Sequence, residues 1–348
     1  MSDPKKFLIV GAGLSGVCVA IQLLREGIDV TLVDDGKNES SVIAAGMINP
    51  LVFRRMTKSW RVDEFLPYLI DFYTKLELET SASFFSEVVI RRLFSHEQEG
   101  DFWLDKQSNS EFENYMFPIS EEDTQYAKAI NLFGSGRVKN AFTVDARPFL
   151  ESAKKWISER GSILFETVDY PQLDETCYKG IKYDTLVFCE GYHNLSNPWF
   201  GDLPINPTKG ETLTISSENL PEDESLNRKC FVLPLGNKQF KIGSTYVWET
   251  PKAETSEDGK KEILENLSHL TPENVIVLDH EAGVRPTIRD RRPILGRHPN
   301  HPNYTIFNGM GAKGYMLAPL LSREFVLHLL IDQKLDPEVR VERFYLGR

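Results

Sequence analysis

The chain begins with two short apolar segments that are separated by an amphipathic stretch. Residues 7–10 (FLIV) and 30–33 (VTLV) are nearly all apolar, as expected for parallel strands that are buried on both faces. Apolar side chains between 14 and 24 recur at helical spacing, and Gly27 can end that helix in a left-handed conformation. The pattern therefore predicts a βαβ unit at the start of the chain.

Elements of the same kind are expected further along. Asp145 is a candidate N-cap for a helix whose apolar residues fall at helical spacing, and a strand near 163–165 should follow it. Another strand is expected at 184–189, and a buried strand at 304–307 precedes a helix from about 313 to 330. These segments indicate a sheet covered by helices and completed by the C-terminal part of the chain.

Three strands between these segments have a different character. Turn-prone stretches separate them and favour an antiparallel meander, with strands at 211–215, 230–233 and 240–245. We therefore expect an α/β fold, in which a Rossmann-type dinucleotide-binding domain is joined to a second, mainly antiparallel β-sheet domain for the substrate. The expected boundaries are 1–52, 140–205 and 280–348 for the first domain, and 53–139 and 206–279 for the second.

A glycine-rich turn follows the first strand directly and opens the first helix. Gly11 permits a tight turn, Gly13 lets the backbone approach a pyrophosphate, and Gly16 allows close packing of helix on strand. Asp34, at the end of the second strand, is placed to accept hydrogen bonds from ribose hydroxyls. The strand, the helix and the acid at this spacing predict a dinucleotide site, although the motif does not separate NAD from FAD.

Size and charge restrict the possible partners and the location. A chain of 348 residues is long enough for one large domain or two associated domains. The net charge of −11 opposes binding to nucleic acids, and the basic clusters at 54–55, 91–92 and 289–292 are far apart in the sequence. No apolar run approaches the roughly 20 residues of a membrane span, and no signal-peptide pattern is evident. We expect a cytoplasmic protein.

The cysteines do not form a pattern. They occur singly, without a CxxC spacing or paired histidines, which argues against a disulfide framework and against a structural zinc site. We therefore expect buried thiols and no metal, with the four cysteines being Cys18, Cys177, Cys189 and Cys230.

Several further segments resemble glycine oxidase and the wider D-amino-acid oxidase and sarcosine oxidase family. The small-residue run SSVIAAGMINP resembles the segment that follows the second strand in that family, and PTKGE resembles its turn into the substrate sheet. The sequence AGVRP looks like the family's carboxylate-binding segment, and NGMGAKGYMLAP is similar to its last glycine-rich turn. These motifs occur in the family's order, with glycine oxidase the nearest in motif. Residues 54–140 show no clear match.

The resemblance implies FAD as the cofactor and oxidation of a C–N bond by hydride transfer to flavin N5. Sarcosine oxidase-like members of the family attach the flavin to a cysteine near the segment that the region around Arg285 resembles. This region contains no cysteine here, so the resemblance implies non-covalent FAD. Small residues and backbone N–H groups suit contact with a flavin ring, and Lys313 can add a positive charge there. The candidate FAD-binding residues are Gly11, Gly13, Leu14, Ser15, Gly16, Asp34, Asp35, Ser40, Ser41, Ala45, Gly46, Met47, Val168, Gly191, Gly309, Met310, Gly311, Ala312, Lys313, Gly314, Tyr315 and Met316.

Arg285 and Tyr246 are the candidate catalytic residues. An arginine before a proline is biased to extended backbone and can hold a carboxylate with two parallel hydrogen bonds. The alternative for Arg285 is an internal salt bridge, and the alternative for the aromatic residues Phe231, Tyr246 and Trp248 is a place in the core rather than in a substrate pocket.

Three functions are compatible with these residues. The first is a free-standing amine or amino-acid oxidase or dehydrogenase, in which oxygen or another acceptor reoxidises the flavin. The second is oxidation of a modified amine on a larger carrier, as in the flavin domain of a tRNA-modifying bifunctional enzyme. The third is a non-catalytic FAD-binding partner subunit. The acidic charge and the absence of a methyltransferase region weigh against the second, and we expect the first.

Overall fold

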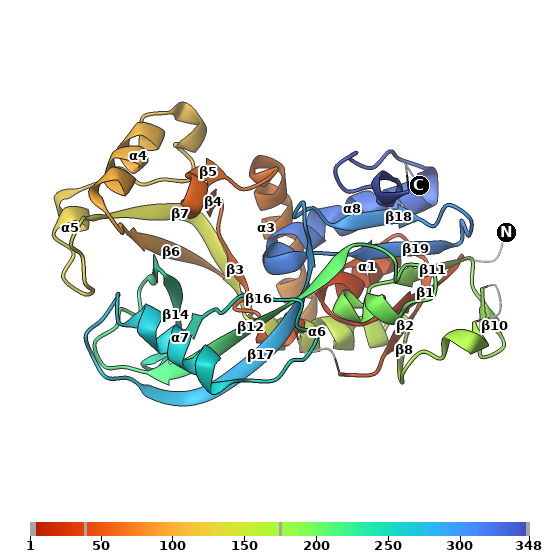
Figure 1. Cartoon of the computed structure of the whole chain (residues 1–348). Helices are drawn as coiled ribbons and strands as arrows, with labels where there is room; N and C mark the ends of the chain where they lie inside the picture. The colour runs from red at the N-terminus through yellow and green to blue at the C-terminus, as the bar shows by residue number, and fades with distance from the viewer. Residues whose placement is uncertain (1–4, 38–39, 174–175, 346–348) are drawn as a thin grey trace.

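The computed structural model describes residues 5–37, 40–173 and 176–345 and shows two lobes, each built on one large sheet (Figure 1). The N-terminal strand lies in the middle of the sheet of one lobe, and the C-terminal segment packs on the same lobe. The chain passes between the lobes several times, so neither lobe is a continuous segment.

The first lobe contains a six-stranded sheet. Its strands are parallel except for β18, which runs antiparallel to β19. The order is β18 (Ile294–Arg297), β19 (Tyr304–Asn308), β11 (Thr185–Phe188), β1 (Lys6–Val10), β2 (Asp29–Asp34) and β8 (Ser162–Phe165). The predicted βαβ unit is therefore confirmed, as are the predicted strands around β8, β11 and β19.

Long helices cover this sheet. Helix α1 packs against α6 and α8, and α3 packs against the same two helices. Their bounds are α1 (Leu14–Arg25), α3 (Val62–Thr80), α6 (Ala146–Ser158) and α8 (Gly314–Ile331). Helix α6 begins after Asp145 as predicted, although that side chain makes no capping hydrogen bond.

Helix α8 corrects one expectation. Together with the preceding turn it forms a helical stretch, Gly311–Ile331, that is long and apolar enough to cross a membrane, whereas no such stretch was expected. Of an 18-residue apolar segment within this stretch, 61% is buried inside the protein, and α8 packs on α1 and α3. Its apolar character is accounted for by this position in the core.

The second lobe contains a nine-stranded sheet that is mainly antiparallel. Strands β13, β14 and β15 form a meander, and β12 pairs with β15, not with β14 as the predicted meander required. Strand β17 pairs along the whole of β12. The strands are β16 (Val247–Trp248), β12 (Ile205–Ser216), β15 (Gln239–Gly243), β14 (Cys230–Gly236), β13 (Ser225–Arg228), β6 (Phe85–Leu93), β7 (Ser135–Val144), β3 (Met47–Ile48) and β17 (Ile276–Ile288).

Smaller elements complete the two lobes. Two short hairpins are formed by β4 (Leu51–Val52) with β5 (Thr57–Lys58), and by β9 (Cys177–Tyr178) with β10 (Ile181–Lys182). The short helices are α2 (Ser40–Ile43), α4 (Glu97–Gln107), α5 (Glu121–Thr124) and α7 (Glu257–Leu267), with 3₁₀ turns η1 (Phe53–Arg55), η2 (Ser110–Phe112), η3 (Tyr170–Gln172), η4 (Gly191–Ser196), η5 (Gly311–Lys313) and η6 (Val341–Phe344). All four cysteines are free, and Cys177 is only partly buried, contrary to the expectation for that thiol.

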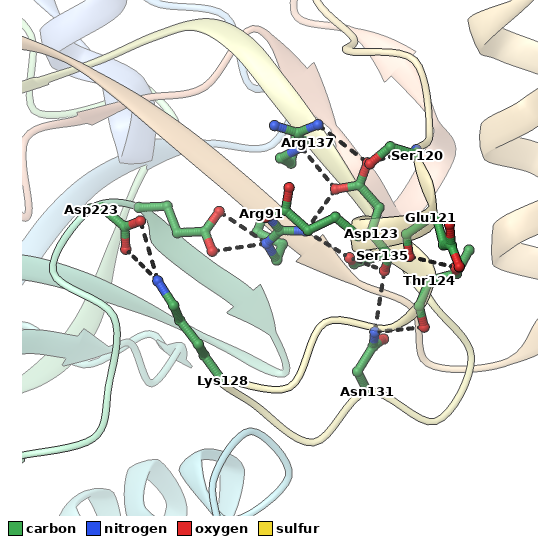
Figure 2. Close-up of polar contacts among 12 residues, drawn as sticks. Arg91, Ser120, Glu121, Asp123, Thr124, Lys128, Asn131, Ser135, Arg137 and Asp223 are labelled. Carbon is green, nitrogen blue, oxygen red and sulfur yellow. Dashed lines mark hydrogen bonds and ion pairs between the residues drawn. The ribbon is translucent and has the colours of Figure 1, made fainter.

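A buried ion-pair network holds the far end of the second lobe together. Arg91 on β6 is 2% exposed and donates to Glu224 at 2.9 Å and to Asp123 at 2.7 Å. Figure 2 shows Arg137 approaching the same Asp123, with Ser135 beside Arg91. The basic cluster at 91–92 therefore lies in internal ion pairs rather than on a basic surface, since Arg92 pairs with Glu99.

Candidate functional site

Two cavities meet at the N-terminus of α1. The larger has a volume of about 300 Å³ and the smaller about 200 Å³. Gly13 and Cys189 line both, so the two chambers are adjacent, with the glycine-rich turn between them. The larger chamber reaches from this turn to the nine-stranded sheet, and the smaller lies beside the ends of β1 and β2.

The glycines of the turn are required by close backbone contacts. Gly11 has a φ of +96°, and a Cβ atom built on Gly16 would lie 1.8 Å from the carbonyl oxygen of Gly11. At Gly13 a Cβ atom would lie 3.1 Å from Ser41 Oγ. Gly16 therefore serves packing inside the turn, while Gly13 keeps the space in front of the helix open.

The N-terminus of α1 is left without a neutralising group of its own. Its N-cap residue, Gly13, has no side chain to cap it, and its first turn contains no acidic residue. The N–H of Leu14 donates to Ser41 Oγ at 3.1 Å, which joins the helix to α2. Because a helix N-terminus carries unpaired N–H donors and a partial positive charge, this arrangement suits an anion such as a diphosphate.

The smaller cavity is lined mainly by polar and charged side chains. Four predicted residues, Gly11, Asp34, Asp35 and Val168, lie in its wall together with Gly13. Asp34 accepts a hydrogen bond from the N–H of Ala12 at 3.2 Å and pairs with Lys154 at 3.0 Å.

Sequence reasoning missed most of the other residues in this wall. They come from the segments that follow β8 and β11, which no glycine motif marks. They are Glu166, Thr167, Tyr170, Glu190, His193 and Ser196, with Cys189 shared between the chambers.

Most of the other predicted FAD-binding residues line the larger cavity. One wall comes from α2 and the segment after it, and another from η5 and the start of α8. The predicted residues in its lining are Gly13, Leu14, Ser15, Ser40, Ser41, Ala45, Gly46, Met47, Gly191, Met310, Gly311, Ala312, Gly314 and Tyr315. Tyr315 donates to the carbonyl oxygen of Ser41 at 2.7 Å and so ties the two walls together.

Five predicted residues lie outside the lining of both cavities. Gly16 and Gly309 are packed against other parts of the protein. A Cβ atom on Gly16 would lie 1.8 Å from the carbonyl oxygen of Gly11, and one on Gly309 would lie 2.8 Å from Ile288 Cγ1. Met316 is buried, Tyr246 is exposed, and Lys313 turns away to donate to Ser59 Oγ and to the carbonyl oxygen of Asn49. Burial lowers the pKa of Lys313 to about 8.

Arg285 lies on the face of the nine-stranded sheet that closes the larger cavity. Its Nη2 donates to Ser244 Oγ at 2.8 Å, its Nη1 to the carbonyl oxygen of Thr245 at 3.4 Å, and the Tyr246 ring lies 5.3 Å from its guanidinium carbon. Among the described residues no carboxylate lies within 4.0 Å of it, so the salt-bridge alternative finds no support. Burial lowers the pKa of Arg285.

Other residues of this sheet face were not expected from the sequence. Gly210 and Thr212 lie at alternate positions of β12, which places both side-chain positions on the cavity face. The hydroxyl of Thr212 is buried and has no hydrogen-bond partner among the described residues. The remaining lining residues are Ile43, Ala44, Phe231, Ser244, Gly283, Pro286 and Asn308, of which Ala44, in the small-residue run, and Phe231 were expected in the site.

Comparison with known proteins identifies the family. The model of the family described as FAD dependent oxidoreductase matches residues 6–326. The chain belongs to this family. Glycine oxidase of Pseudomonas putida is 24% identical over 90% of this chain and 92% of its own. The bifunctional protein ThiO/ThiG of Nostoc is 22% identical, and the match covers 96% of this chain but only 54% of that protein.

Solved structures agree with this assignment at the level of the fold. Glycine oxidase from Geobacillus kaustophilus has a TM-score of 0.78 at 18% identity, with 95% of this chain and 96% of that chain covered. Iminodiacetate oxidase from Chelativorans has a TM-score of 0.79 at 18% identity, with 97% and 98% covered. The predicted α/β fold, the FAD cofactor and the oxidoreductase class are therefore confirmed.

Proposed function

We propose that the protein oxidises the C–N bond of a small amine or amino acid, with FAD bound non-covalently across the two cavities and the substrate carboxylate held by Arg285. The relatives named for glycine and iminodiacetate oxidation are consistent with a small amino-acid substrate. The cytoplasmic location stays a prediction.

The paired cavities fit the two ends of FAD. The smaller chamber, with Asp34 at its wall, suits the adenosine end, and the N-terminus of α1 between the chambers, whose first turn contains no acidic residue, suits the diphosphate. The small residues Ala45 and Gly46 in the larger chamber suit a planar ring that lies against the backbone. When bound, FAD supplies the hydride acceptor for the reaction.

The proposal rests mainly on the guanidinium group of Arg285, which has no carboxylate partner among the described residues. Two of its five N–H groups are used by Ser244 and Thr245, and three remain for a ligand. A half-buried cation without an acidic partner lowers the stability of the folded protein unless a bound anion neutralises its charge. A carboxylate bound there would be oriented by two parallel hydrogen bonds.

The residues that line the larger cavity also restrict the protonation state in which the substrate amine can react. Among the described residues of the larger cavity, Arg285 is the only one that is charged at neutral pH. No carboxylate or histidine there can accept a proton from an ammonium group, so the reacting amine must bind in its neutral form. The chain contributes the position of the substrate rather than a general base.

A substrate panel tests the proposal. The purified protein should be yellow, and heat or acid should release the flavin as FAD. Hydrogen peroxide formation, or reduction of an artificial electron acceptor, is then measured with glycine, sarcosine, proline, iminodiacetate and D-amino acids. Activity with at least one carboxylate-bearing amine is expected. A preference for amines without a carboxylate would contradict the role of Arg285, and inactivity with the whole panel would favour the larger-carrier or non-catalytic alternatives.

A further inference from the structure

Glu190 is a buried acid in the wall of the smaller cavity to which the proposed reaction gives no role. It lies between β11 and η4 and is 9% exposed. Tyr170 donates its hydroxyl to Oε1, and Asn197 donates from Nδ2 to Oε2 at 2.7 Å. A Cβ atom built on Gly11 would lie 3.5 Å from the Glu190 Cα, so the backbone of this acid lies against the glycine-rich turn.

Glu190 differs from the other acids of the same cavity. Those acids each have a lysine partner, in the pairs Asp34–Lys154, Asp35–Lys37 and Glu166–Lys179. Among the described residues, no lysine or arginine lies within 4.0 Å of the Glu190 carboxyl group, and its hydrogen-bond partners Tyr170 and Asn197 are both neutral. His193 faces the same cavity, and burial lowers its pKa below its ordinary value, so it is largely neutral near pH 7 and does not compensate the acid.

The charge of this carboxyl group changes in the physiological range. Burial raises the pKa of Glu190 to about 7, although the hydrogen bonds from Tyr170 and Asn197 oppose the rise because they favour the charged form. Glu190 is therefore mainly neutral in mildly acidic solution and mainly charged in mildly alkaline solution. A negative charge in the wall of this cavity, which Gly11 and Gly13 also line, opposes a diphosphate bound at the glycine-rich turn, in surroundings that screen charges less than water does.

We propose that Glu190 makes the affinity for FAD depend on pH, because the cofactor binds to the form of the protein in which this carboxyl group is neutral. The inference rests on the placement of the adenosine end of FAD proposed above. When only one form binds, the apparent Kd equals the intrinsic Kd divided by the fraction of that form. If the charged form does not bind at all, Kd should rise about thirtyfold from about pH 6 to about pH 8.5, and partial binding gives a smaller rise.

Dilution of the holoenzyme tests this dependence without any assay of activity. The fluorescence of released FAD gives the Kd at each pH between about pH 6 and about pH 8.5. We expect Kd of the wild-type protein to rise at least threefold over this range, and Kd of Glu190→Gln to change by less than about twofold. Glu166→Gln is the matched control, since Glu166 lines the same cavity but is paired with Lys179, and it should keep the wild-type pH dependence.

Tyr170→Phe gives an independent test that leaves Glu190 in place. It removes a hydrogen bond that favours the charged carboxylate, so the rise in Kd should move to higher pH. If Glu190→Gln is insoluble, this shift decides the question. A flat wild-type profile, an unchanged slope in Glu190→Gln or an unshifted rise in Tyr170→Phe would overturn the inference while leaving the oxidation of a carboxylate-bearing amine intact. A purified protein without FAD would overturn both.

Discussion

The guanidinium of Arg285 lies directly over the backbone of Gly210. A Cβ atom built on Gly210 would lie 2.0 Å from Nη2 and 2.2 Å from Nη1. Strands β12 and β17 pair so that Gly210 lies opposite Gly283. Arg285 is two positions further along β17, so its side chain can reach diagonally across to Gly210. The glycine therefore provides the surface on which the arginine side chain rests.

Gly210→Ala should displace the guanidinium without changing its charge. We expect kcat/KM for the active carboxylate substrate to fall about 10- to 100-fold, since misplacement by about 1 Å has effects of this size, with normal FAD content. The double variant with Arg285→Ala should be no worse than Arg285→Ala alone, because the glycine acts through the arginine. Additive losses would show that Gly210 acts in another way.

Arg285→Ala removes the only cation in the lining of the larger cavity among the described residues. Loss of the partner of a desolvated carboxylate should cost about 3–5 kcal/mol, which lowers kcat/KM about 10²–10⁴-fold. Arg285→Lys should restore only part of the activity, because an ammonium group cannot form the paired hydrogen bonds. Steady-state kinetics measures both variants, and a kcat/KM of Arg285→Ala within a few-fold of wild type would exclude the carboxylate role.

Gly13→Val should prevent FAD retention. The branched side chain would fill the space in front of α1, where even a Cβ atom would lie 3.1 Å from Ser41 Oγ. The flavin absorbance of the purified variant gives the FAD content, and circular dichroism checks that the chain is folded. Normal FAD content in a folded Gly13→Val protein is the result that would refute this placement of the diphosphate.

Arg91→Met tests the ion-pair network of the second lobe. Leaving Asp123 and Glu224 buried without this cation should lower the free energy of unfolding by about 3–5 kcal/mol. Lys128→Met is the matched control, because Lys128 and Asp223 form an exposed pair that should contribute less than about 1 kcal/mol. Urea denaturation monitored by circular dichroism gives the free energy of unfolding of both variants. Equal losses would show that burial does not determine how much each ion pair contributes to stability.

The sequence was most informative where the determinants of structure are local. The unit β1–α1–β2 could be predicted because the glycine-rich turn, the helical stripe and Asp34 are close together in the chain. The pairing of β12 with β15 could not, since short strands separated by turns fit several sheet orders equally well.

The residues of the site, too, could be predicted only where the signal lies in one local segment of the chain. Arg285 was identified from a segment resemblance, whereas its contacts with Gly210 and Ser244 arise only from strand pairing between distant segments. Glu190 and Tyr170 were missed because their positions follow β11 and β8 without a motif. For Lys313 the segment was found but the direction of the side chain was not, because its partner Ser59 comes from a part of the chain that showed no motif.

The two chambers that share Gly13 and Cys189 also affect how much of this protein a cell can maintain. A ligand that fills them binds the folded chain and not the unfolded one, so each tenfold excess of free FAD over its Kd adds about 1.4 kcal/mol to the free energy of unfolding. When riboflavin is scarce, a larger fraction of the chain should be unfolded and open to proteases. The steady-state amount of the protein should therefore follow the supply of the vitamin, even at a constant rate of synthesis.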